Sequence, residues 1–265
     1  MTLRSAISTP EGKRRHVGRL FATIAERYDF VTRVLSYGRD QHWKRRLIAL
    51  AAIGPRDRVL DLACGTGDLF FAAAARAGVA VGVDITHRML ELAGSRGRAD
   101  TGVPVPPRPL RLVEADMLTL PFESARFDVV TTGYGLRNAS DLPRALAEIH
   151  RVLAPGGRLL SLDFNRPGHP LVRAAYLTYL TVVGSVLGLV LHGDPDTYRY
   201  VPESIRLYPG AAGVASLMAR TGFTDVRVVP LLGGLMAIHL ARRSSALQPR
   251  LQRVEKERED LLLGD

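Results

Sequence analysis

A glycine turn between a short apolar run and a helical pattern is the first feature of this 265-residue sequence that could do chemistry. Residues 60–69 read LDLACGTGDL, with Gly65 and Gly67 inside the turn. A strand that runs into such a turn and then into a helix presents backbone N–H groups and a helix N-terminus to a ligand. Because glycine has no side chain, a ligand can approach the backbone closely. The pattern therefore predicts a ligand site at this turn.

The residues around the turn discriminate between nucleotide ligands. A dinucleotide-binding turn follows the pattern G-x-G-x-x-G, whose third glycine allows close packing of the helix. Phe70 occupies that third position, and Asp61 and Asp68 place negative charge on both sides of the turn. Such charge repels a pyrophosphate but not a ligand that carries an ammonium group and a sulfonium. The turn therefore favours S-adenosylmethionine over NAD as the cofactor.

Further acidic residues follow the next predicted strands. Asp84 ends the second apolar run, where a carboxylate can accept hydrogen bonds from both ribose hydroxyls. Asp116 and Met117 follow the third run, where an acidic group can meet an adenine amino group while a thioether packs on the ring. An aspartate after a strand is also a common helix N-cap, so each one alone is weak evidence. Three at successive strand ends indicate one site, because ligands bind at the carboxyl edge of such sheets.

Apolar runs alternate with helical patterns along most of the chain, which predicts an α/β fold with a parallel sheet covered on both faces. The last two strands flank the glycine pair Gly233 and Gly234 and would close the sheet as a hairpin, which is unusual among doubly wound folds. The predicted strands are 58–62, 79–84, 110–115, 127–133, 157–164, 225–231 and 235–241. The predicted helices are 15–27, 33–51, 67–78, 86–97 and 141–154.

The sequence predicts one domain with additions. We expect a flexible tail at 1–14, the α/β domain at 15–242 and a polar tail at 243–265. A helical insertion at about 167–209 interrupts the alternation before the last two strands. Within it, residues 174–191 contain no charged residue, and the length of this segment is at the lower limit for a membrane span. Its threonines, serine and glycines favour the other interpretation, a helix that covers an apolar pocket.

Charge and cysteine content narrow the partners and the compartment. The formal net charge is +10, and residues 1–58 contain 13 Lys and Arg against five Asp and Glu. No nucleic-acid-binding motif accompanies this charge, so an anionic membrane surface is a better partner than nucleic acid. Cys64 is the only cysteine, and the N-terminus lacks the apolar core of a signal peptide, which together predict a cytoplasmic protein. The histidines lack metal-ligand spacing, so we expect no metal.

Several stretches of the chain, over about residues 16–242, resemble class I methyltransferases of the quinone-biosynthesis C-methyltransferase family, which act on demethylmenaquinone and polyprenyl benzoquinols. GLRN and PESI are specific to that family, whereas GTG and PGG belong to methyltransferases at large. The matching stretches are YDFVTRVLSYGRDQHWKR, VLDLACGTGDL, GVDITHRML, EADMLTLPF, GYGLRNASDLPRALAEIHRVLAPGGRLLSLDFNRP, YRYVPESIRLYP, GFTDV and GGLMAIH.

The resemblance implies a Rossmann-like fold with a seven-stranded sheet, an antiparallel last strand and an N-terminal helical lid. The chain departs from the family where Gly133 replaces a frequent Ser and Thr32 replaces the usual Asn. From the turn and the resemblance together, the expected S-adenosylmethionine-binding residues are Asp61, Gly65, Thr66, Gly67, Asp84, Ile85, Asp116, Met117 and Gly133.

Ring methylation requires a carbon nucleophile, which a quinol supplies when one of its hydroxyls is ionised. Arg137 follows the fourth predicted strand, where a guanidinium would stabilise the oxyanion, and the resemblance adds Asn138 and Tyr28 as catalytic residues. Alternatively, Arg137 and Asn138 cap the helix that starts at Asp141, and Tyr28 only packs between helices. The implied acceptor is a polyprenyl quinol at the inner face of the membrane, of the demethylmenaquinone, benzoquinol or demethylphylloquinone type.

Two alternatives to this function stay open at this point. The acceptor could be another lipophilic phenol, or the chain could bind S-adenosylmethionine without catalysis. Whether the protein forms a homodimer is also open.

Overall fold

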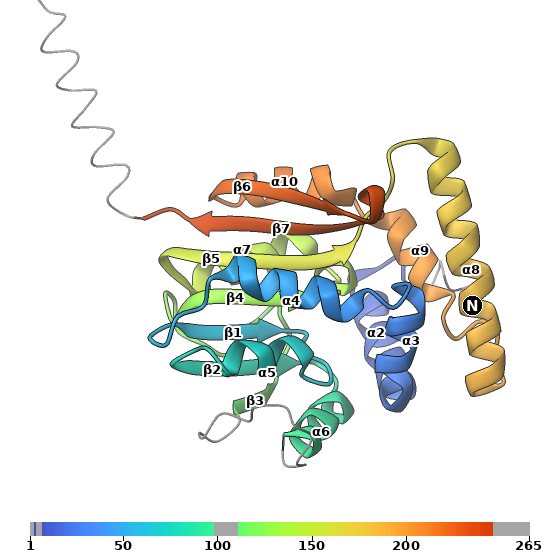
Figure 1. Ribbon diagram of the computed structural model, residues 1–265, viewed down its shortest axis with the longest axis horizontal. Helices are drawn as coiled ribbons and strands as arrows, with labels where there is room; N and C mark the ends of the chain where they lie inside the picture. Colours follow the sequence, from blue (N-terminus) through green and yellow to red (C-terminus); the bar gives the residue numbers. More distant parts are fainter. Residues whose placement is uncertain (1–2, 4–6, 98–110, 246–265) are drawn as a thin grey trace, which may run out of the picture.

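The computed structural model describes residue 3, residues 7–97 and residues 111–245, and Figure 1 shows their arrangement. Most of the tail expected at 243–265, and the first residue of the strand expected at 110–115, lie outside the described residues. A single seven-stranded sheet has the order β3-β2-β1-β4-β5-β7-β6. The strands are β1 (Arg58–Leu62), β2 (Val79–Asp84), β3 (Arg111–Glu114), β4 (Phe127–Gly133), β5 (Leu153–Phe164), β6 (Phe223–Leu231) and β7 (Met236–Arg243).

The first five strands are parallel, and β7 runs antiparallel to both of its neighbours, β5 and β6. The seven-stranded sheet with an antiparallel last strand is therefore confirmed. From β1 the chain first moves outward through β2 and β3, and then returns to the other side of β1 with β4. This reversal makes a crevice between the carboxyl ends of β1 and β4, where open α/β sheets bind their ligands.

Alternation along the strands builds a core on each face of the sheet, because successive side chains point to opposite faces. Val59 and Val129 belong to the cluster that packs on α4 (Asp40–Ala51). Their chain neighbours Leu60 and Val130 belong to the opposite cluster, which includes residues of α7 (Leu142–Val152) and α10 (Gly210–Arg220). The remaining helices flanking the sheet are α5 (Asp68–Ala74) and α6 (His87–Arg96).

A group of helices lies beyond the carboxyl edge of the parallel strands, at the right of Figure 1. They are α2 (Pro10–Ile24), α3 (Tyr28–Leu35), α8 (Pro170–His192) and α9 (Tyr200–Leu207). Three short 3-10 turns complete the described elements, Ala25–Arg27, Leu136–Asn138 and Leu232–Gly234. These helices are the N-terminal lid and the insertion expected from the sequence, and they come together over the ligand-binding edge.

Two helix boundaries differ from those expected. Helix α2 begins at Pro10, inside the segment 1–14 expected to be a tail, because the Thr9 hydroxyl accepts from the Gly12 amide and proline suits the first turn. The single helix expected at 33–51 is two helices. They are separated at Tyr37 and Gly38, whose φ angles of 54° and 71° lie in the left-handed region.

Candidate active site

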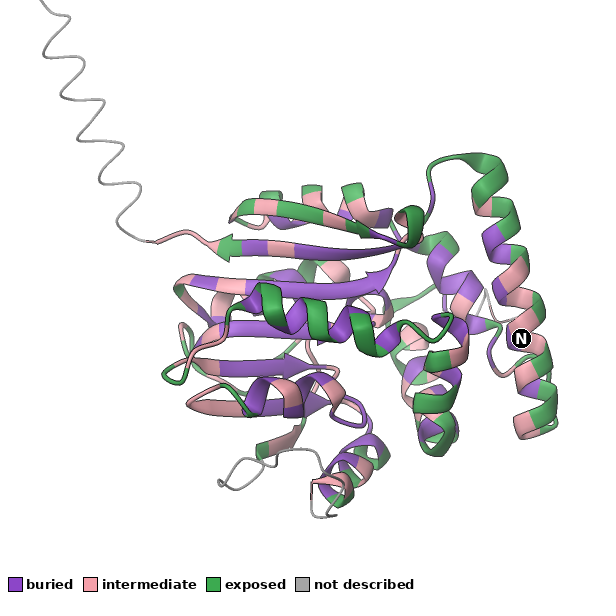
Figure 2. Cartoon of the chain, viewed as in Figure 1, coloured by how far each residue is buried: buried purple, intermediate pink, exposed green. Residues whose placement is uncertain are grey.

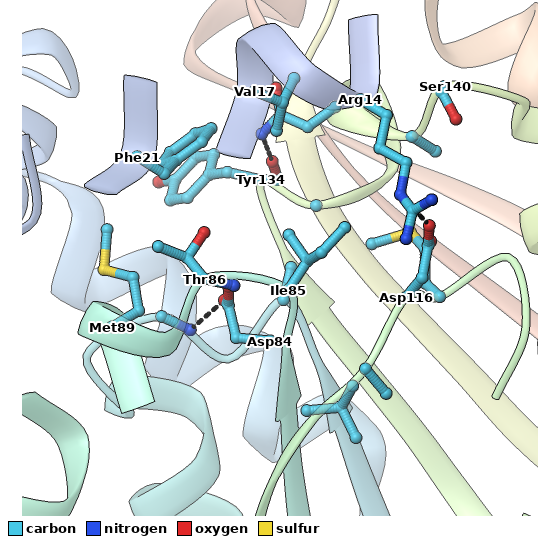
Figure 3. A pocket seen from close by; sticks show the side chains of 18 of the residues that line it. Arg14, Val17, Phe21, Asp84, Ile85, Thr86, Met89, Asp116, Tyr134 and Ser140 are labelled. Atoms are coloured by element: carbon cyan, nitrogen blue, oxygen red, sulfur yellow. Dashed lines mark hydrogen bonds and ion pairs between the residues drawn. The ribbon is translucent and has the colours of Figure 1, made fainter. Parts of the chain in front are cut away.

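A cavity enclosing about 720 Å³ of empty space opens at the carboxyl ends of β1 to β4 (Figure 3). We call it the edge cavity. Eight of its residues were singled out from the sequence as site residues: Tyr28, Gly65, Asp84, Ile85, Asp116, Met117, Gly133 and Asn138. Val17 and Phe21 of α2 close it from above the sheet. The structure therefore brings the ends of four separate strands and the helical lid to one cavity.

Asp84 fixes the glycine turn in the edge cavity. Its Oδ2 accepts from the Gly65 amide at 2.9 Å and its Oδ1 from the Thr86 amide at 2.8 Å. Burial raises the pKa of Asp84, and these backbone N–H groups oppose that shift. Each carboxylate oxygen has two lone pairs, so acceptor capacity remains for the hydroxyls of a ligand.

Gly67 has a structural role at the start of α5. It precedes α5 with a φ of 95°, and a Cβ at this position would lie 2.5 Å from the Phe71 ring. It does not line the edge cavity or the two cavities described below. Glycine is needed here for the turn into α5 and for packing against Phe71, and the sequence pattern does not separate this need from ligand approach.

A small polar compartment lies beside the edge cavity and shares Tyr28, Gly65 and Gly133 with it. Asp61 lines this compartment, and its Oδ1 accepts from the Thr131 hydroxyl at 2.7 Å. Its Oδ2 is buried and has no partner among the described residues. Burial raises the pKa of Asp61 to about 7. A buried carboxylate oxygen without a partner is suited to a cationic ligand group.

Asp68, on the other side of the turn, is already paired. Its carboxylate contacts Lys44 Nζ at 2.8 Å and Arg96 Nη1 at 2.6 Å. Although burial acts against ionisation, Lys44 and Arg96 lower the pKa of Asp68 to about 2. Thr66, also in this compartment, donates its hydroxyl to Asp29 at 2.6 Å. Of the two aspartates that flank the turn, only Asp61 is left to meet a ligand cation.

Asp116 and Met117 lie at the opposite end of the edge cavity, as expected. Arg14 of α2 reaches Asp116, with 2.9 Å between Nε and Oδ2, a contact that the sequence analysis did not predict (Figure 3). Lys13, the preceding residue, donates to the carbonyl oxygens of Arg137 at 2.9 Å and Ala139 at 2.6 Å. The basic run at 13–15 was interpreted only as surface charge, yet two of its side chains tie the lid to the loops that follow β3 and β4.

Gly133 lies at the end of β4, where the family often carries Ser. A Cβ here would lie 2.9 Å from Leu69 Cδ1. Leu69 Cδ1 is the end of a flexible side chain, so a serine at this position would require only that this leucine shift.

A second cavity, with about 510 Å³ of empty space, adjoins the first and is lined largely by apolar side chains of α2, α3 and α9. We call it the apolar cavity. Tyr28 and Asn138 line both cavities, and Arg137 lines the apolar one. The three residues predicted to be catalytic therefore lie at or beside the junction. Burial raises the pKa of Tyr28 to about 12, so its hydroxyl is a hydrogen-bond donor near neutral pH.

Arg137 is held in place by buried partners. Its backbone N–H donates to Asp163 Oδ2 at 3.0 Å, its Nε lies 3.3 Å from Asp163 Oδ1, and its Nη1 donates to the Ser204 hydroxyl. Its guanidinium lies 5.1 Å from the centre of the Phe164 ring. Asp141 caps α7 by accepting from the Arg144 amide, so Arg137 and Asn138 are not its N-cap. Only 4% of Arg137 is exposed, which makes it a buried cation beside an apolar cavity.

Solved methyltransferase structures share this fold, which confirms the class I methyltransferase fold expected from the sequence. The fold matches an S-adenosylmethionine-dependent methyltransferase from Thermotoga maritima, with a TM-score of 0.59 and 16% identity, over 86% of this chain and all of that one. A second such enzyme, from Aquifex aeolicus, matches with a TM-score of 0.54 and 16% identity, over 76% of this chain and 89% of that one. Among the described residues, no group of three or more His, Cys, Asp and Glu could hold a metal ion.

Sequence comparison defines the family. The model of the ubiE/COQ5 methyltransferase family matches residues 9–243. A demethylmenaquinone methyltransferase from Thermus thermophilus is 42% identical over 226 residues, which are 84% of this chain and all of the relative. A ubiquinone/menaquinone biosynthesis C-methyltransferase from Ectopseudomonas mendocina is 40% identical over 230 residues, 86% of this chain and 88% of the relative. The chain belongs to the ubiE/COQ5 family and is an S-adenosylmethionine-dependent methyltransferase, as the resemblance indicated.

Proposed function

We propose that this enzyme methylates a ring carbon of a prenylated quinol in the biosynthesis of menaquinone or a related quinone. The names of the two relatives support this substrate class. The observation that carries the proposal is the junction of the two cavities. The edge cavity, which carries the carboxylates of Asp84 and Asp116, adjoins the more apolar cavity, and Tyr28 and Asn138 line both.

The residues of the edge cavity and of the polar compartment beside it fit S-adenosylmethionine. The unpartnered Oδ2 of Asp61 would receive the ammonium group, and Asp84 would accept from the ribose hydroxyls. Asp116 and Met117 would hold the adenine, with Arg14 and the rest of α2 excluding water. When bound, S-adenosylmethionine supplies an electrophilic methyl group on its sulfonium.

The residues of the apolar cavity fit an aromatic ring with an apolar tail. Arg137 provides a fixed positive charge that favours the ionised form of a ring hydroxyl, because Asp163 and Ser204 hold its side chain in place. Ionisation of that hydroxyl makes the adjacent ring carbon nucleophilic. Tyr28 lies at the junction and orients the ring toward the edge cavity.

We also propose that the enzyme works in the cytoplasm at the inner face of the membrane, docked through α8. This helix is long and apolar enough to cross a membrane, and only 28% of its most apolar window is buried (Figure 2). Its exposed residues Val182, Val186, Leu189 and Val190 follow helical spacing and share one stripe. Tyr37 stacks on Tyr179 of this helix, which joins it to the basic N-terminal region.

Vesicle flotation tests this docking. Binding to anionic vesicles should fall steeply with salt but not to zero, because salt screens the basic residues and leaves the apolar stripe. A Val186→Ser, Val190→Ser double variant should lose the salt-resistant part, whereas Val228→Ser, at an exposed apolar site on β6, should keep it. Binding that survives alkaline carbonate would mean an integral span. Absence of binding together with a dimer in solution would assign the stripe to a second copy of the chain.

The quinone content of cells that lack the gene tests the substrate class. A demethylated quinone should accumulate, and its ring type would identify which of the three quinols is the substrate. Complementation with the wild-type gene should restore the methylated form, whereas Arg137→Ala should not. An unchanged quinone pool would overturn the proposal and favour another lipophilic phenol.

A further inference from the structure

Two buried polar atoms in the apolar cavity have no hydrogen-bond partner among the described residues. They are the hydroxyl of Tyr200, at the start of α9, and Oδ1 of Asn138. Asn138 uses its amide N–H₂ to donate to the Tyr134 carbonyl at 2.8 Å, which leaves its oxygen free. A buried polar atom without a partner costs free energy, so two on one cavity wall need an explanation.

The other tyrosines around this cavity have partners for their hydroxyls. Tyr134 donates to Asp40 at 2.7 Å, and Tyr198 contacts His192 Nε2 at 2.9 Å. Tyr200 is as well buried as they are, with 1% of its surface exposed. Among the tyrosines that line this cavity, Tyr200 is therefore the one whose hydroxyl is buried without a partner among the described residues, and Asn138 shares the cavity wall with it.

We propose that Tyr200 donates a hydrogen bond to the ring oxygen that ionises, while Asn138 Oδ1 accepts from the second ring hydroxyl. This pair of roles rests on the proposed function and makes Tyr200 a further catalytic residue. It fits a 1,4-dihydroxylated ring, which offers one oxygen as an anion and the other as a hydroxyl donor. Burial raises the pKa of Tyr200 well above its ordinary value, so the hydroxyl keeps its proton throughout and acts only as a donor.

Three titratable side chains face Tyr200. Arg137 and Asp163 act on it from the loop after β4 and from β5, and the His16 ring of α2 lies 5.3 Å from its own ring. Burial and Arg19 lower the pKa of His16, so that group is neutral where the quinol ionises. A change in the pH profile of kcat above neutral pH therefore reports on ionisation of the quinol and not of His16.

Tyr200→Phe removes only the hydroxyl, and Tyr208→Phe is its matched control. The Tyr208 hydroxyl is also buried and unpartnered, but Tyr208 does not line the apolar cavity. With a short-chain demethylated quinol, Tyr200→Phe should lower kcat about 10- to 100-fold, the range for a hydrogen bond to a charged group. The acid limb of its pH profile should move up by about 1 to 2 units, with S-adenosylmethionine affinity unchanged. Tyr208→Phe should keep the wild-type profile.

The substrate's second hydroxyl tests Asn138. The mono-methyl ether of the quinol, blocked at the ring oxygen remote from the methylated carbon, should be a poorer substrate for the wild type by about 10-fold or more. Asn138→Ala should reduce this discrimination. An unmoved acid limb in Tyr200→Phe, an equal loss in Tyr208→Phe, or full activity on the ether would each overturn the inference. If the wild type methylates no quinol at all, the proposed function itself fails.

Discussion

Asp61→Asn should affect cofactor binding and folding stability in opposite directions. The variant keeps the shape of the side chain and an oxygen that can accept from Thr131, but it removes the negative charge from the polar compartment. If Asp61 holds the ammonium group, affinity for S-adenosylmethionine should fall by about 1.5–3 kcal/mol, or roughly 10- to 100-fold. Titration calorimetry at pH 7.5 measures this directly.

The stability change follows from the buried carboxylate. Burial raises the pKa of Asp61 from 3.8 to about 7, which corresponds to about 4 kcal/mol of penalty on the ionised form in the folded state. The asparagine escapes this penalty but buries an N–H₂ group without an acceptor, at a cost of about 1–3 kcal/mol. The unliganded variant should therefore be more stable than the wild type by about 1–3 kcal/mol at pH 7.5.

The contribution of Asp61 to folding stability depends on pH. Because the folded-state pKa lies above the unfolded one, the folded protein holds a proton that the unfolded chain releases. The Asp61 contribution to wild-type stability therefore falls as the pH rises from about 4 to about 7, and it is level above that. Denaturant titrations across this pH range should show this decline in the free energy of unfolding of the wild type. In the variant, the part of the decline that comes from Asp61 should be absent. Equal S-adenosylmethionine affinity in the two proteins, or a variant less stable at pH 7.5, would refute the reasoning.

Three further substitutions separate the parts of the site. Gly65→Val should abolish S-adenosylmethionine binding in calorimetry, because the φ of 54° is strained for a β-branched residue and the side chain would enter the cavity. Binding retained in this variant would exclude the turn as the cofactor site. Arg137→Ala should keep cofactor affinity and lose turnover. It should also lower the free energy of unfolding by about 3–5 kcal/mol, because Asp163 is left as a buried unpaired charge. Arg137→Lys should restore more of the stability than of the activity. Lys13→Met should lower kcat and speed hydrogen exchange in 10–24, because it loses two carbonyl acceptors; unchanged exchange would mean that the lid is held by apolar contacts alone.

The strand ends could be predicted from the sequence because parallel strands converge on one edge. Asp84, Asp116 and Met117 each follow an apolar run, and the sheet brings them to one cavity without further information. Gly67 shows the limit of the motif. One pattern serves both ligand approach and a left-handed turn, and the contact with Phe71 shows that the turn by itself already requires glycine at this position.

Residues that act across the lid could not be found from sequence order. Lys13 reaches the Arg137 carbonyl over 124 positions of the chain, and a basic run looks the same whether it is solvated or docked. The orphaned hydroxyl of Tyr200 is invisible for the same reason, since a missing partner is a property of the packed cavity. The break between α3 and α4 depends on left-handed angles at Tyr37 and Gly38, where the turn signal SYG was overridden by the helical pattern on either side.

Incubation of the purified protein with a short-chain demethylated quinol, under reducing conditions, and S-adenosylmethionine carrying a trideuterated methyl group tests the central claim most directly. Mass spectrometry and NMR of the product should show one trideuterated methyl group attached to a ring carbon, with both ring oxygens unmethylated. A methyl group on oxygen, or no methylated quinol alongside intact binding of S-adenosylmethionine, would contradict the account.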